Sequence, residues 1–271
     1  MGAQLRRLGV WSALLLVFNV DADVEGDRYP LAKRAMPDLA GAVEGLLAGH
    51  EVMLGDTSSE ANCQAFGQLL WERATEGVPT DDRRLYWARL AALHHLTPSS
   101  NAPQDMALHE NCRSSFEAAS RGRAELSWKE GHYRLLVSGF DPFLLDRNIE
   151  QSNPSGLAAL RLDDQVLESS GGTLIHVRAV IFPVRFGDFD QGTLESLLGP
   201  LIEDDRIDAF VSISMGRDAF DLERFPGRRR SASSPDNLNG LSGGSEKAPI
   251  VPELGGVELE GPEFLEFSLP A

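Results

Sequence analysis

The amino-acid sequence predicts an α/β fold: an open, mostly parallel sheet with flanking helices, preceded by an α-helical N-terminal region. Two observations lead to this prediction. Up to about residue 123, apolar residues recur every three to four positions, which is the spacing of amphipathic helices. From about Trp128 onward, short β-rich apolar runs alternate with helical segments, and this order is typical of βαβ units and a parallel sheet.

The helical region contains amphipathic segments that are separated by turn-forming stretches such as GDTSSEAN and GVPTDD. The predicted helices lie in DLAGAVEGLLAGHEVML, CQAFGQLLWERA, DRRLYWARLAALHHL and CRSSFEAASRGRAEL. No motif in these segments carries recognisable chemistry, and we expect Trp71 and Trp87 to be core residues. We interpret this region as a small helical bundle or cap.

The second region contains three predicted strands with a helix between each successive pair. The strands are expected in YRLLVSGF, TLIHVRAVIFPV and IDAFVSISM, and the helices in SGLAALRLDD and GTLESLLGPLIED. Functional residues of such folds gather where the strands end. The segments that directly follow the strands are therefore the candidates for a site.

We predict three parts along the chain: a signal peptide at residues 1–22, a helical region at 23–127 and the α/β domain at 128–271. Arg6 and Arg7 precede an apolar run that ends at Phe18, and Val20 and Ala22 have the spacing of a cleavage site. This pattern predicts a secreted or periplasmic protein. The alternatives are a buried N-terminal helix and a cytoplasmic location. The run is too short to span a membrane, so we expect no membrane span.

Charge and cysteine content restrict the partners further. With 41 acidic and 25 basic residues, the formal net charge of −16 repels phosphate backbones, so we expect no nucleic-acid partner. Cys63 and Cys112 are the two cysteines. In an exported protein they are candidates for a disulfide, and in the cytoplasm for buried thiols. Their spacing is not that of metal ligands, and we expect no metal.

The segments after the strands form an ordered set: GFDPF, NPSG, SMGRDAFDLERF and SPDN. This set resembles pyroglutamyl peptidase I, in which a strand leads into G-F-[DE]-P-F, then an N-P-[ST] helix start, a Gly-Arg segment, an E-R pair and P-D-N. The resemblance covers about residue 133 to the C-terminus and does not extend to the helical region. It implies a cysteine-type exopeptidase that removes N-terminal pyroglutamate from peptides without a cofactor.

The resemblance also implies roles for individual residues. Phe140 and Phe143 match the aromatic residues that sandwich the lactam ring of pyroglutamate. Asn153 matches the family's asparagine, although Asn before Pro154 is equally typical of a helix start. Glu223 matches the catalytic acid of the family.

Two further residues, Arg217 in MGRD and Asp236 in PDN, match family positions that support the site rather than touch the substrate. The nucleophilic cysteine and the catalytic histidine of the family have no counterpart in this chain. The resemblance therefore implies a C-terminally incomplete peptidase that is inactive as written. The alternative is a non-catalytic protein that binds pyroglutamyl or other N-terminally capped peptides.

Overall fold

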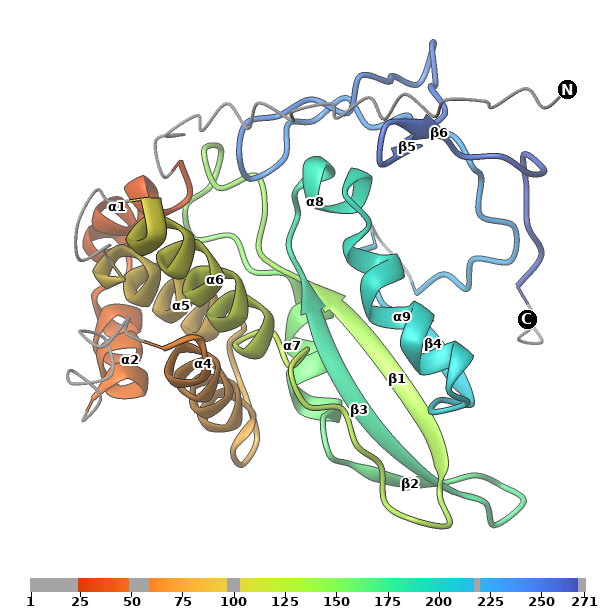
Figure 1. Ribbon diagram of the computed structural model, residues 1–271, viewed down its shortest axis with the longest axis horizontal. Coiled ribbons are helices and arrows are strands. Elements are labelled where there is room, and N and C mark those ends of the chain that lie inside the picture. The colour runs from red at the N-terminus through yellow and green to blue at the C-terminus, as the bar shows by residue number, and fades with distance from the viewer. Residues whose placement is uncertain (1–23, 49–58, 97–102, 217–219, 268–271) are drawn as a thin grey trace, which may run out of the picture.

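The computed structural model describes residues 24–48, 59–96, 103–216 and 220–267. It confirms the predicted fold class: an N-terminal helical region precedes a mostly parallel four-stranded sheet that is flanked by helices (Figure 1). The predicted signal peptide at 1–22 and Arg217 lie outside the described residues.

The helical region packs around large buried side chains, among them Phe66, Trp71, Trp87 and Phe116. α6 ends at Ala119, although the predicted segment continued to residue 126, because the chain turns at Gly122 (φ +76°). A Cβ atom at Gly122 would lie 2.7 Å from the Trp71 ring. The elements are η1 Gly26–Arg28, α1 Tyr29–Ala35, α2 Pro37–Leu47, α4 Glu60–Thr75, α5 Arg83–His95 and α6 Pro103–Ala119.

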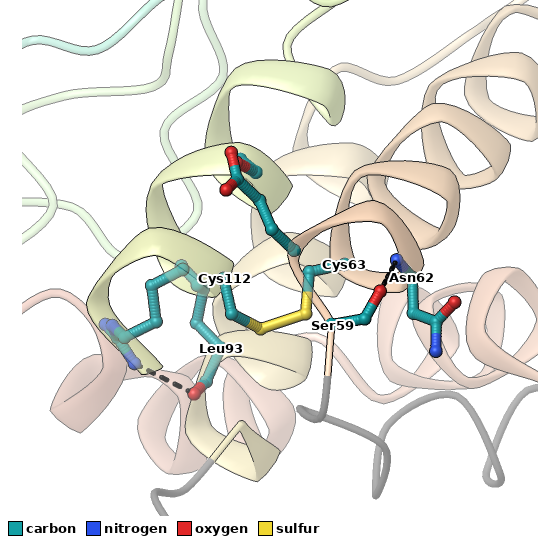
Figure 2. The surroundings of a disulfide bond; sticks show 8 residues. Ser59, Asn62, Cys63, Leu93 and Cys112 are labelled. Atoms are coloured by element: carbon teal, nitrogen blue, oxygen red, sulfur yellow. Dashed lines mark hydrogen bonds between the residues drawn. A yellow bond between two sulfur atoms is a disulfide. The ribbon is translucent and has the colours of Figure 1, made fainter. Parts of the chain in front are cut away.

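A disulfide joins Cys63 of α4 to Cys112 of α6, with a Cα–Cα distance of 5.3 Å (Figure 2). Both cysteines are buried. One turn along α4, a Cβ atom at Gly67 would lie 2.5 Å from the Phe116 carbonyl oxygen, so the backbones of the two helices approach closely at this glycine. Figure 2 also shows Ser59 capping α4 by accepting a hydrogen bond from the Asn62 amide at 3.2 Å.

The sheet has the strand order β2-β3-β1-β4. β1 (Tyr133–Phe140) lies between β3 (Leu174–Phe182) and β4 (Ala209–Ser212), and both neighbours run parallel to it. β2 (Val166–Glu168) pairs antiparallel with β3 at one edge. The sequence did not predict β2, because its three residues are all exposed and show no apolar alternation.

Helices cover both faces of the sheet (Figure 1). On one face α7 (Pro154–Leu162) and the N-terminal helices share a core with β3, which includes Ala159, Leu160 and Ile181. On the other face α8 (Phe186–Asp190) and α9 (Thr193–Glu203) pack over a second cluster that includes Leu136 and Val180. The helical region therefore shares its hydrophobic core with the sheet.

Residues 220–267 form long loops with one short hairpin, β5 (Glu253–Leu254) and β6 (Val257–Glu258). Outside the hairpin, the segments 224–230 and 263–267 lie side by side. The Arg228 amide donates to the Glu263 carbonyl at 2.7 Å, and the Phe267 amide donates to the Arg224 carbonyl at 3.0 Å. In Figure 1 this part of the chain, drawn in blue, passes beside the upper end of the sheet.

Within the described ranges, no helix combines the length and the apolar character that crossing a bilayer requires.

We predict that removing the disulfide destabilises the protein. Cys63 and Cys112 are separated by 49 positions. Releasing a loop of that size should cost about 4 kcal/mol on the chain-entropy model. Urea unfolding of the Cys63→Ala/Cys112→Ala variant should therefore show a clearly lower midpoint than the wild type. The reduced wild-type protein is the control that keeps both side chains, and an unchanged midpoint in both samples would contradict the prediction.

Candidate functional site

The carboxyl edge of the parallel strands is the place where this fold offers a site. Asp141 directly follows β1, and Val184, Arg185 and Phe186 follow β3. A loop from the C-terminal part of the chain reaches the same edge at Asp236 and Asn237.

A buried carboxylate at Asp141 holds two arginines from the helical region. Asp141 Oδ2 accepts hydrogen bonds from Arg89 Nη2 and Arg121 Nη1, both at 2.7 Å. The exposed fractions of Arg89, Arg121 and Asp141 are 0%, 1% and 2%. Such an ion pair is fully desolvated, and each partner depends on the other to remain charged. Asp141 therefore ties α5 and the end of α6 to the end of β1.

The ion network continues through Glu117 on α6. Glu117 accepts hydrogen bonds from Arg121 Nη2 at 3.0 Å and from Arg185 at 3.1 Å, and Arg185 also pairs with the buried Glu25. Burial alone would raise the pKa of Glu117, but the guanidinium groups of Arg185, Arg121 and Arg89 outweigh this effect and hold the pKa well below its usual range. Glu25, in turn, accepts a hydrogen bond from the Tyr86 hydroxyl at 3.0 Å.

Asn153 is the N-cap of α7. Its Oδ1 accepts a hydrogen bond from the Ser155 amide at 3.1 Å, and its Nδ2 donates to the Asp141 carbonyl at 3.0 Å. The helix start lies against β1, since a Cβ atom at Gly139 would be 2.2 Å from the Ser155 carbonyl oxygen. The sequence left two roles open for Asn153, the asparagine of the peptidase family or a helix start. The contacts described here are those of a helix start.

Phe140 and Phe143 do not face each other across a described pocket. Phe140 is half-buried, and its ring lies 6.2 Å from that of Phe182 and 6.4 Å from that of Phe189, on the side of α8 and α9. Phe143 is half-buried in the turn that follows β1. Phe140 thus forms part of an aromatic group with Phe182 and Phe189.

The Asp236 carboxylate holds together a loop that lies at the carboxyl ends of β1 and β3. Its carboxylate accepts hydrogen bonds from the amides of Phe186, Leu238 and Gly240 at 2.8 to 2.9 Å. The neighbouring Asn237 donates from Nδ2 to the Pro142 carbonyl at 2.9 Å, and its amide donates to the Val184 carbonyl at 2.9 Å. The PDN segment therefore fastens the ends of β1 and β3 together.

Glu223 is exposed, and within the described residues it takes part in no hydrogen bond or ion pair. His176 lies in β3, where Nδ1 accepts a hydrogen bond from the Lys129 amide at 2.9 Å and Nε2 lies 2.8 Å from Asp164. The described part of the chain places no three His, Cys, Asp or Glu side chains where they could hold a metal ion.

A hollow of about 280 Å³ lies between the start of α9 and the β5–β6 hairpin. The sequence offered no signal for it, because the hairpin and the helix are some 60 residues apart and the hairpin strands have two residues each. Apolar and acidic side chains line it together with one arginine: Phe189, Asp190, Leu194, Glu195, Arg230, Pro252, Glu253, Leu254 and Leu259. Arg230 is paired with Asp190 and lies over the Phe186 ring.

The family model that matches this chain is not that of the family its motifs resemble. Residues 134–264 match the family model described as PA0049, C-terminal domain. The chain is 31% identical over 199 residues to the protein named "Uncharacterized protein PA0049" of Pseudomonas aeruginosa. The match covers 62% of this chain and 36% of that protein, so the chain spans only about a third of this relative. No solved structure matches the chain.

The prediction that this chain is a C-terminally incomplete member of the pyroglutamyl peptidase I family is wrong. The family model that matches residues 134–264, where the motifs lie, is the PA0049 C-terminal domain. The structure explains why the motifs misled. Gly139 allows the close approach of α7, Asn153 caps that helix, and Asp236 organises a loop. Short motifs of Gly, Pro, Asn and Asp are also what tight turns require.

We predict that Asp141→Asn strongly destabilises the protein. The substitution removes the carboxylate at 2.7 Å from both buried guanidinium groups, and it leaves Arg89 with only Glu117, 3.9 Å from its Nε, as a carboxylate partner. Breaking a buried pair in this way costs about 3–5 kcal/mol. Urea unfolding measures the loss. The exposed pair between Lys33 and Glu44 provides the control, since Glu44→Gln should change the midpoint little. Equal effects of the two substitutions would contradict this assignment.

We also predict a pH dependence of stability that arises from Asp82. Its carboxylate is buried and accepts a hydrogen bond from the Asn153 amide at 2.9 Å; burial raises its pKa to about 7. Because the folded-state pKa is raised, the protonated form contributes stability at low pH that is lost as the pH rises through 7. The loss between pH 5 and pH 8 should be about 2–3 kcal/mol.

The test is urea unfolding of the wild type and of Asp82→Asn at both pH values. The variant cannot ionise at this position, so its stability should change less between pH 5 and pH 8. A wild type and a variant with the same pH profile would show that Asp82 does not titrate in this range.

Proposed function

We propose that this chain is a non-catalytic peptide-binding protein, and that its ligand places an apolar side chain in the hollow between α9 and the β5–β6 hairpin. The observation that carries the proposal is the hollow itself, with an apolar wall that includes Leu194, Leu254 and Leu259. The carboxyl edge of the strands is the usual site in this fold class. Here it is occupied by the ion network and by the loop around Asp236.

The size of the hollow lies at the lower limit for small-molecule pockets and suits a small apolar group. Pockets for drug-sized ligands have volumes of about 300–1,000 Å³, and this hollow has about 280 Å³. One apolar side chain, or a small neutral ring such as a pyroglutamyl cap, fits that volume. A nucleotide would also bring phosphates to a chain with a net charge of −16.

The rim of the hollow favours a basic residue beside the apolar one. Glu195 and Glu253 have no ion-pair partner among the described residues, and Glu253 lies opposite Glu258 in the hairpin. The positive charge of Arg230 is offset by Asp190. A Lys or Arg next to the bound side chain would relieve this excess of negative charge.

The Cys63–Cys112 disulfide supports both binding without covalent chemistry and a location outside the cytoplasm. Cys63 and Cys112 are joined to each other, so neither is a free thiolate in this state. Disulfides persist in oxidising compartments, which supports the proposal of a secreted or periplasmic protein.

The test is fluorescence anisotropy with labelled peptides that contain Leu beside Lys-Arg, compared with Leu beside Gln-Gln. We expect saturable binding of the basic peptide, and Leu254→Arg should weaken it at least about tenfold because the new side chain fills and charges the hollow. Val257→Arg is the matched control. It adds the same charge to the same hairpin at a residue that is 68% exposed and lies outside the lining of the hollow.

Equal binding by the Leu254→Arg and Val257→Arg variants, or no saturable binding of either peptide, would contradict the proposal. Pyroglutamyl and acetyl versions of the basic peptide test whether an N-terminal cap adds affinity. Release of pyroglutamate from the pyroglutamyl peptide would contradict the non-catalytic assignment.

A further inference from the structure

β4 forms an edge of the sheet that no other described strand covers. The strand order ends at β4, and within the described residues β1 is the strand that pairs with it. An uncovered edge presents backbone N–H and C=O groups that can pair with another extended chain. The opposite edge of the sheet, β2, offers less surface for such pairing, because it has three residues and all of them are exposed.

The backbone groups that face outward along β4 belong to Phe210 and Ser212. The Ile213 amide donates to the Ser138 carbonyl of β1 at 2.8 Å. Successive amides along a strand point in opposite directions in the plane of the sheet, so the amides of Phe210 and Ser212 point away from β1. Ser212 is exposed. An incoming chain can therefore reach this edge.

An apolar strip lies beside the edge on the face of the sheet where α7 packs. Phe210 points to the other face, where it packs against the cluster under α9. Side chains alternate between the two faces of a strand, so Ala209, Val211 and Ile213 share the α7 face. All three are half-buried. An added strand with apolar residues at every second position would cover the exposed part of this strip and gain hydrophobic stabilisation.

Acidic side chains gather at the amino end of β4. Residues 203–208, EDDRID, include four acidic residues and one arginine. Asp208 is paired with Arg134 at 2.8 Å. Glu203 and Asp204 are exposed and form no ion pair within the described part of the chain. A basic residue next to an added strand would be attracted to this end of β4.

We propose that the uncovered edge of β4 binds an extended peptide, which adds a fifth strand to the four-stranded sheet. The peptide has apolar residues at alternate positions and a Lys or Arg beside the acidic end of β4. Main-chain hydrogen bonds supply the affinity in this mode of recognition, and alternate side chains supply the specificity. A second copy of this chain is disfavoured as the occupant, because each copy carries a net charge of −16.

The experiment measures fluorescence anisotropy of the full chain with a labelled peptide in which Val and Thr alternate between Lys-Arg pairs at both ends. We expect saturable binding that is at least about tenfold tighter than that of a version with Glu-Glu pairs. Ser212→Pro removes an outward-facing amide and should weaken binding at least about tenfold, since proline cannot donate a hydrogen bond but is tolerated in an edge strand.

Val166→Pro on β2 is the matched control and should leave binding unchanged. The Gln165 carbonyl accepts a hydrogen bond from the Val177 amide of β3 at 2.9 Å, so the next amide, that of Val166, points away from the sheet. The control therefore also removes an outward-facing amide, but at the opposite edge.

A second measurement uses the wild-type chain and does not depend on the folding of Ser212→Pro. Two versions of the basic peptide carry N-methyl groups either on the valines or on the threonines, so only one version loses the amides that face β4. Their affinities should differ at least about tenfold.

The proposal is overturned if the wild type shows no saturable binding, if the two methylated peptides bind alike, if the acidic peptide binds as tightly as the basic one, or if a folded Ser212→Pro variant binds like the wild type. Equal weakening by Val166→Pro would also overturn it. A wild-type dimer in size-exclusion chromatography that Ser212→Pro dissociates would instead assign the edge to a second copy. Ser212 does not line the hollow, so a peptide held there would respond to Leu254→Arg and not to Ser212→Pro.

Discussion

The ion pairs of Asp141 with Arg89 and Arg121 are the interaction on which the rest of the structure depends. They join α5 and the end of α6 to the end of β1 at a point that water does not reach. The hydrophobic core crosses the same boundary, from the helices to Ala159 and Ile181. A helical region that shares both a core and a buried charge network with the sheet behaves as part of one folding unit.

The same network occupies the carboxyl edge of the parallel strands. Charged side chains at the ends of parallel strands often serve chemistry, but here Asp141, Glu117 and Glu25 neutralise buried guanidinium groups. A carboxylate that is committed in this way is not available as a general acid or base. Among the described residues that line the hollow, Glu195 and Glu253 form no ion pair.

The sequence predicted the elements whose apolar pattern is long and missed those without one. β1 occupies Tyr133–Phe140, the run expected from YRLLVSGF, because this run is rich in β-forming apolar residues, and four of its eight residues are buried. β2 and the β5–β6 hairpin have two or three mostly exposed residues per strand and therefore no period to detect. The ion pair between Glu25 and Arg185 joins residues 160 positions apart, and no local pattern indicates such a contact.

The helical region contributes no residue to the lining of the hollow, yet it determines where α8 lies. Arg185 is the N-cap residue of α8, and it is held by Glu25 from the start of the helical region and by Glu117 from α6. Phe189, one turn further along α8, lines the hollow and contacts Phe182, over which Arg123 lies. Because Phe189 of α8 lines the hollow, a change in the ion network around Arg185 would be expected to alter the geometry of the hollow. The charges buried between the helical region and the sheet are thus a physical link between the stability of this fold and the geometry of the proposed peptide site.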